Sequence, residues 1–189
     1  FSQEDTETVE EVVVTGSYIK GSATDGASPV EIISRETIDA LSASTVADIT
    51  ANLAINNGSE NQVDSFTVGG GQGSSNVNLR GLGLTSTLVL LDGKRHTTAG
   101  IPANDGAVYV NTNIIPVNAI ERVEVLKEGA ASVYGSDAVA GVVNYIFRRN
   151  FDGLEIDVST QETDLGGSTD DKVSLLYGKS SENGNFVFA

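Results

Sequence analysis

Apolar and polar residues alternate through the last part of the chain, and this pattern restricts the fold more than any other feature of the sequence. Apolar side chains occupy every second position in 154–158 and 173–177, and the alternation begins again at Phe186 and Phe188. Because successive side chains of a strand point to opposite faces, each run predicts a strand with one apolar and one polar face. Residues 164–170 form a longer link between these strands, and 182–185 form a tight turn.

Three antiparallel strands of this kind fit two different structures. Strands with an apolar outer face, joined by alternately longer and shorter turns, are typical of an outer-membrane β-barrel. An ordinary hairpin with one buried face would show the same alternation. If the protein ended at Ala189, residues 186–189 would be an unpaired apolar edge. We therefore expect the natural protein to continue beyond this position.

Composition excludes several classes of function. With 11 Lys and Arg against 26 Asp and Glu, the net charge is −15, which disfavours binding to nucleic acid or to an anionic membrane surface. No apolar run reaches the roughly 18 residues of a transmembrane helix, so any membrane span must use strands. Cysteine is absent, which excludes disulfide bonds, thiol catalysis and thiolate metal sites in this sequence.

The sequence offers no recognisable catalytic motif. His96 is the single histidine, and no G-x-S-x-G motif is present to carry a hydrolase nucleophile. The tripeptide at 178–180, GKS, lacks the earlier glycine of a phosphate-binding loop. A calcium site made of carboxylates alone in 164–170 stays open, although its spacing is not that of an EF-hand. We predict a protein that is not an enzyme and that uses no cofactor or metal.

The N-terminal part is predicted to be a tail and a linker. The first eleven residues carry five acids and no base, which favours an extended and solvated segment. Residues 12–15 are β-prone and stop at Gly16. They could form an ordinary first strand, or they could add to the sheet edge of a partner. Residues 20–28 are rich in Gly, Ser and Ala, as expected of a linker.

Between 29 and 150 the pattern predicts short strands and helices separated by polar loops. Strands are expected at 29–33, 77–81, 88–91, 120–126 and 141–147. Helices are expected at 35–41 with Ser34 as N-cap, near Ser44, and at 130–134. In 120–126, Val123 and Val125 share one face, and Arg122 and Glu124 share the other. Polar, glycine-rich sequence predicts loops at 56–76 and 96–113.

Three blocks of sequence in this region are more specific than the rest. The first is NLRGLG at 78–83 and the second is LVLLDGKR at 88–95. The third and most specific runs from 120 to 146, IERVEVLKEGAASVYGSDAVAGVVNYI. In order and spacing, the three blocks resemble the plug domain of TonB-dependent receptors. Residues 10–16, EEVVVTG, are similar to the TonB box of that family, but differ at the first two positions, where the family often has Asp-Thr.

The resemblance implies a fold and a division of the chain. The fold class is an α+β plug domain, with a small mixed sheet and short helices, followed by the first strands of a transmembrane antiparallel β-barrel of about 22 strands. Residues 1–19 are then a flexible tail that contains the TonB box, 20–150 the plug, and 151–189 the first barrel strands. A barrel of that width cannot fill its lumen with its own side chains, which is why a plug must occupy it.

The resemblance also implies a function, active import of a scarce nutrient across the bacterial outer membrane, in which the plug gates the lumen. Its partners would be TonB, with ExbB and ExbD, through a periplasmic TonB box, and outer-membrane lipid through the barrel. The substrate would be a small molecule, glycan or peptide. Two alternatives stay open. One is a signal-transducing receptor of the same family, with a folded domain before the TonB box, and the other is a soluble β-rich binding domain.

Site residues follow from the resemblance and from the expected outer loops. The TonB box comprises Glu10, Glu11, Val12, Val13, Val14, Thr15 and Gly16. Arg80 and Arg122 match family arginines that pair with carboxylates of the barrel. Side chains able to hydrogen-bond or stack in loops near 66–76, 84–87 and 96–109 are candidate ligand contacts: Gln72, Asn76, Thr85, His96, Thr98, Asn104, Asp105 and Tyr109.

Overall fold

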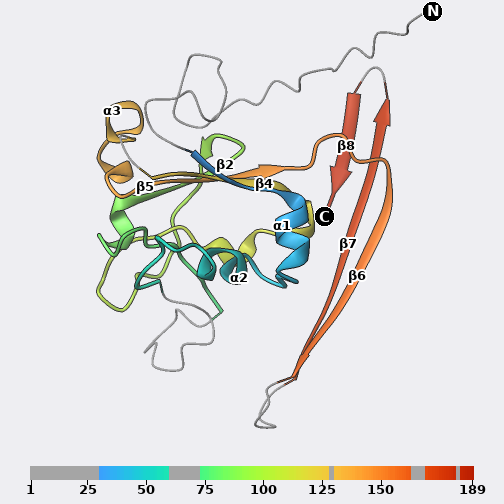
Figure 1. Cartoon of the computed structure of the whole chain (residues 1–189), viewed down its shortest axis with the longest axis horizontal. Coiled ribbons are helices and arrows are strands. Elements are labelled where there is room, and N and C mark those ends of the chain that lie inside the picture. The colour runs from blue at the N-terminus through green and yellow to red at the C-terminus, as the bar shows by residue number, and fades with distance from the viewer. Residues whose placement is uncertain (1–29, 60–72, 128–129, 163–168, 182–183) are drawn as a thin grey trace, which may run out of the picture.

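A computed structural model describes residues 30–59, 73–127, 130–162, 169–181 and 184–189, and Figure 1 shows their arrangement. A mixed sheet with short helices lies beside a second, three-stranded sheet made by the end of the chain. The predicted TonB box at 10–16, Gln72 and most of the predicted link at 164–170 lie outside the described residues. Within the described ranges, no helix has the length and apolar character needed to cross a membrane.

The mixed sheet has five strands in the order β1-β4-β5-β2-β3. Their bounds are Val30–Ile33 for β1, Thr87–Leu91 for β2, Lys94–Arg95 for β3, Ile120–Leu126 for β4 and Gly141–Phe147 for β5. β2 and β5 run parallel, and the other neighbours are antiparallel. The strands predicted at 29–33, 88–91, 120–126 and 141–147 are thus confirmed to within a residue.

The helices begin where side chains cap them. α1 (Arg35–Ala40) follows Ser34, whose hydroxyl accepts from the Thr37 backbone N–H at 3.4 Å, as predicted. α2 (Val46–Ala51) begins slightly later than predicted because Thr45 is its cap and Asp48 completes a capping box with it. α3 (Ala131–Tyr134) is a single turn. The short 3-10 helices are η1 (Leu84–Ser86), η2 (Thr112–Ile114), η3 (Val117–Ala119) and η4 (Ser136–Ala138).

The mixed sheet buries apolar side chains on both faces. On the face covered by α1 and α2, Val123, Val125 and Tyr145 pack with Ile38 and Ile49 from the helices. On the other face, a smaller cluster joins β2, β4 and β5 to the segment that holds α3 and η4. Helices on one side and short helical turns on the other therefore fix the positions of the loops that leave the sheet.

The strand predicted at 77–81 is wrong. Leu79 forms an isolated antiparallel bridge with Asn56, and its N–H donates to the Thr87 hydroxyl at 3.0 Å. The chain turns immediately afterwards, because Arg80 has a φ of 59° and Gly81 a φ of 65°. This left-handed region suits glycine but strains arginine. The alternation of apolar and polar side chains at 77–81 does not predict such a turn.

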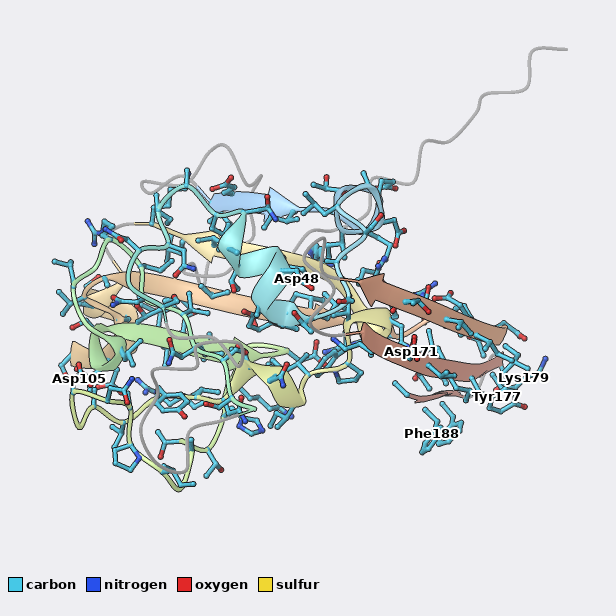
Figure 2. The ribbon with its side chains drawn as sticks, turned by 90° about the horizontal axis from the view of Figure 1, so that it is seen from below. Asp48, Asp105, Asp171, Tyr177, Lys179 and Phe188 are labelled. Atoms are coloured by element: carbon cyan, nitrogen blue, oxygen red, sulfur yellow. The ribbon has the colours of Figure 1, made fainter. Side chains whose placement is uncertain are left out.

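The three strands predicted after position 150 are confirmed. β6 (Gly153–Glu162), β7 (Thr169–Ser181) and β8 (Gly184–Phe188) form an antiparallel sheet in that order. The link between the first two strands is shorter than predicted, since β7 already begins at Thr169. The sheet extends to one side of the mixed-sheet domain (Figures 1 and 2).

Most apolar residues of this second sheet lie on its outward face, and Leu176, which is fully buried, lies on the opposite face. Pairing brings together Leu154 with Tyr177, Ile156 with Leu175, and Val158 with Val173. These six side chains are 43% to 74% exposed. On the opposite face, Glu155 and Lys172 contact residues of the domain. A hairpin that buried its apolar face against the domain would have the reverse orientation.

Candidate functional site

The loop at 96–110 is a compact structure held by its own backbone. The Ala99 N–H donates to the Tyr109 carbonyl at 2.7 Å, and the Ala103 N–H donates to the Ala107 carbonyl at 2.9 Å. The Asp105 carboxylate closes the tip by accepting from the Ala107 N–H at 2.9 Å. The loop therefore presents its exposed side chains in a fixed arrangement.

Tyr109 is buried beneath this loop and joins it to a neighbouring segment. Its ring is 5% exposed and packs with Leu84 and Ala103. Its hydroxyl lies 2.8 Å from the Ser74 hydroxyl. Ser75 continues the attachment, since its N–H donates to the Asn111 side chain at 3.1 Å. The segment that precedes Asn76 is thus joined to the end of the 96–110 loop.

The structure separates the predicted ligand residues into two groups. Thr85, Thr98, Asn104 and Asp105 are exposed, and His96 is half-buried with Nδ1 at 3.0 Å from the Thr97 carbonyl. Asn76, which is 2% exposed, and Tyr109, which is 5% exposed, are buried and do not lie with these exposed side chains. We use the name loop face for the exposed surface formed by Thr85, Thr97, Thr98, Ile101, Asn104, Asp105 and Val108.

Arg80 holds the turn after Leu79 against the segment that leads into β5. Its Nη2 donates to the Val139 carbonyl at 2.9 Å, and its Nε donates to the Ala140 carbonyl at 3.2 Å. Its own backbone N–H donates to the Ile55 carbonyl at 2.6 Å. The strained conformation is therefore maintained by contacts from two distant segments.

Arg122 and Glu124 form an ion pair on one face of β4. Arg122 Nε lies 2.9 Å from Glu124 Oε1, and the Glu124 side chain is 1% exposed. Asn144 of β5 lies opposite, with Nδ2 3.4 Å from Glu124 Oε2. The Asn144 side-chain oxygen Oδ1 accepts from the Gly93 N–H at 2.9 Å. A buried carboxylate is thus compensated inside the domain, next to a cavity of about 820 Å³ lined by Arg122 and Asn144.

The chain leaves the domain at Arg148, which contacts both η3 of the domain and β6 of the second sheet. Its backbone N–H donates to the Ala119 carbonyl at 2.8 Å, and Nη1 donates to Glu155 of β6 at 2.9 Å. The guanidinium also lies 4.5 Å from the centre of the Phe151 ring, which is cation–π geometry. Sequence reasoning used Arg148 only as a boundary and missed this role, although a basic pair between two strand patterns was a usable signal.

Residues 149–152 are attached to the other two strands of the second sheet. Phe151 lies over Gly178 of β7, where an added β-carbon would collide with the Phe151 carbonyl oxygen. Asn185 of β8 donates to the Arg149 carbonyl, and Lys179 pairs with Asp152 at 3.1 Å. We call residues 148–152 the junction. It contacts β6, β7 and β8 together.

Away from the junction, β7 contacts η3, and a cavity separates the second sheet from α1. A cavity of about 1030 Å³ is lined by α1, the α1–α2 connection and residues 113–118 on one side, and by β6 and β7 on the other. Lys172 Nζ reaches across to the Ser44 hydroxyl at 3.5 Å. The domain is therefore in close contact with the second sheet at the junction, and in less close contact along the cavity beside α1.

Arg95 fastens the β2–β3 hairpin to η4. It donates to the Asp137 carboxylate at 2.5 Å and to the Tyr134 carbonyl. The hydrogen bond from Arg95 holds the pKa of the Asp137 carboxyl below its usual range. Both side chains are about half exposed, so the pair contributes little to stability.

Tyr145 and Tyr109 provide a first prediction, on stability. The Tyr145 hydroxyl is fully buried and has no hydrogen-bond partner among the described residues, and burial raises its pKa. Tyr145→Phe should therefore raise the free energy of unfolding by about 1 kcal/mol, whereas Tyr109→Phe, which loses the bond to Ser74, should lower it by about 1 kcal/mol. Urea unfolding of both variants measures the difference, and equal losses would contradict the expectation.

Comparison with known proteins finds one consistent group. A family model described as TonB-dependent Receptor Plug Domain matches residues 22–142. An iron-regulated outer membrane virulence protein of Vibrio cholerae is 33% identical over 151 residues, which cover 79% of this chain and 22% of that protein. The chain thus spans about a fifth of the length of the curated relatives it matches.

Solved structures agree with the family model. The siderophore receptor PirA from Acinetobacter baumannii is 26% identical, with a TM-score of 0.55 and coverage of 79% of this chain and 22% of that chain. The ferric citrate transporter FecA in its unliganded form has a TM-score of 0.65 at 21% identity, and covers 85% of this chain and 24% of that chain. At that identity the second similarity concerns the fold alone.

Proposed function

The chain belongs to the TonB-dependent receptor plug domain family, and from this premise we propose that it serves active import of a scarce nutrient across a bacterial outer membrane. In this proposal residues 20–150 plug the lumen of a β-barrel of about 22 strands, and residues 151–189 are its first strands. The tail at 1–19 carries the TonB box at 10–16. The location is the outer membrane, consistent with the relative that is named an outer membrane protein.

The orientation of the second sheet is the observation that carries the proposal. Its outward face is a continuous apolar surface, and its polar face is turned toward the plug. Outer-membrane barrels place apolar side chains against lipid and polar side chains toward the lumen. A soluble binding domain would leave this surface in water, so the alternative of a closed soluble fold has no support here.

The partners and site residues follow from the same proposal. TonB, with ExbB and ExbD, engages the TonB box by strand addition, and lipid contacts the outward face of β6–β8. Arg80 and Arg122 face carboxylates of barrel strands beyond Ala189, in addition to the partners described above. Ligand meets the plug at the loop face and at His96. The family is one of receptors and transporters and not of enzymes.

Deletion of residues 10–16 from the complete receptor tests the mechanism. Uptake should be lost while ligand binding at the cell surface is retained, because the plug can then no longer be coupled to TonB. Val13→Pro should have the same effect, since proline removes an N–H needed for strand addition. Val13→Thr is the matched control and should preserve uptake. Unchanged uptake after the deletion would refute the proposed coupling.

A further inference from the structure

The loop face carries very little charge. Among its residues, Asp105 is the only ionisable one, and its carboxylate is already used to close the loop through the Ala107 N–H. The sequence contains no lysine or arginine at 36–79 or at 96–121. The segments before and after the loop face in sequence therefore contain no permanently charged cation.

The cations nearest in sequence are held elsewhere. Arg95 is bound to Asp137 and to the Tyr134 carbonyl, and Arg80 is bound to the Val139 and Ala140 carbonyls. Lys94 pairs with Leu91, at the end of β2. The 96–110 loop packs on Leu84, which lies before the beginning of the same strand. The guanidinium groups of Arg80 and Arg95 are therefore bound to partners outside the loop face.

The groups that the loop face does present are neutral. Thr85, Thr97 and Thr98 offer hydroxyls, and Asn104 offers an amide. Ile101 and Val108 are exposed beside them, at 45% and 53%. Because the backbone bonds of the loop fix these groups in advance, little conformational entropy is lost when a matching ligand binds.

We propose, on the basis of the import function above, that the loop face selects an uncharged ligand rich in hydroxyl or amide groups, and not an anionic ferric chelate. An anion loses hydration when it enters a lumen, and this loss is compensated by cations or charge-assisted hydrogen bonds. The loop face offers neither, and the sequence as a whole has a net charge of −15. Hydroxyl, amide and apolar contacts suit a neutral ligand instead.

Binding to the complete receptor distinguishes the two ligand classes. The neutral probes are a ferric trihydroxamate, whose three ligand charges cancel that of iron, and maltohexaose, an uncharged oligosaccharide. The anionic probes are a ferric triscatecholate and ferric citrate. We expect at least one neutral probe to bind about tenfold more tightly than either anionic probe. Comparing the two neutral probes shows whether the neutral ligand is a metal chelate or a glycan. Tighter binding of an anionic probe would overturn the proposal.

A charge-gain variant decides the question even if the wild type binds none of the four probes. Thr98→Lys combined with Asn104→Lys should create or strengthen binding of the ferric triscatecholate by about tenfold, and added salt should weaken that gain. Thr98→Gln combined with Asn104→Gln is the neutral control at the same positions and should produce no such gain in binding of the ferric triscatecholate. A lysine variant that behaves like the glutamine variant would overturn the proposal.

These results are separable from the test of import. If an anionic probe binds tightly but deletion of 10–16 still abolishes its uptake, only the ligand class is wrong. If that deletion leaves uptake intact, the import mechanism fails, whichever probe binds.

Discussion

Replacing Arg122 by alanine is expected to lower the free energy of unfolding by about 3–5 kcal/mol. The substitution leaves the Glu124 carboxylate, which is 1% exposed, without the guanidinium at 2.9 Å that compensates its charge. Asn144 still contacts Glu124 at 3.4 Å but supplies no charge. Because Arg122 is itself 26% exposed, some water can reach the site, and the lower end of that range is expected. Urea unfolding of the purified chain measures the loss.

Two control variants identify the cause of that loss. Arg95→Ala removes an arginine from the exposed pair with Asp137 and should reduce stability far less than Arg122→Ala does. Glu124→Gln combined with Arg122→Ala removes the buried charge together with its partner and should recover much of the stability. If the double variant is no more stable than Arg122→Ala alone, an uncompensated carboxylate is not the reason for the effect.

Cross-linking Ser44→Cys to Lys172→Cys with a short bis-maleimide is expected to abolish uptake by the complete receptor. These positions face each other across the cavity of about 1030 Å³, where the plug and the strands are loosely joined. If import requires the plug to rearrange, a covalent tether on this side prevents it. The sequence has no native cysteine, so within this chain only the introduced thiols react.

The matched control places the tether at the junction. Arg149→Cys cross-linked to Asn185→Cys joins segments that are already in contact, where Asn185 donates to the Arg149 carbonyl. Uptake should then remain close to that of the untethered protein, and so should uptake by each single variant. Equal loss of uptake with both tethers would mean that import requires the plug to separate from β6–β8 at the junction as well.

Much of the fold could be predicted because local and long-range signals agree. Ser34 caps α1 as its residue type suggests, and β4 alternates between buried valines and the Arg122–Glu124 face. β6 and β7 pair in the register that aligns their apolar residues. In each case the side-chain pattern and the backbone hydrogen bonds favour the same element.

The errors occur where tertiary contacts override the local pattern. The strand expected at 77–81 fails because Arg80 adopts a left-handed conformation held by carbonyls some sixty positions away. Tyr109 and Asn76 have polar groups typical of a binding loop, and their burial could not be predicted from these residue types. The junction was missed because Arg148, Phe151 and Gly178 come together only in three dimensions.

The strand order also determines how a mechanical load would enter the plug. β1, the first described strand, is an edge strand held by a single neighbour, whereas the chain continues to the second sheet from β5, the middle strand of the five. Tension between the two ends of the plug therefore acts first on the four paired residues of β1 and last on the centre of the sheet. β1 is therefore the element most easily separated from the sheet, and it is also the described element nearest in sequence to the TonB box proposed at 10–16.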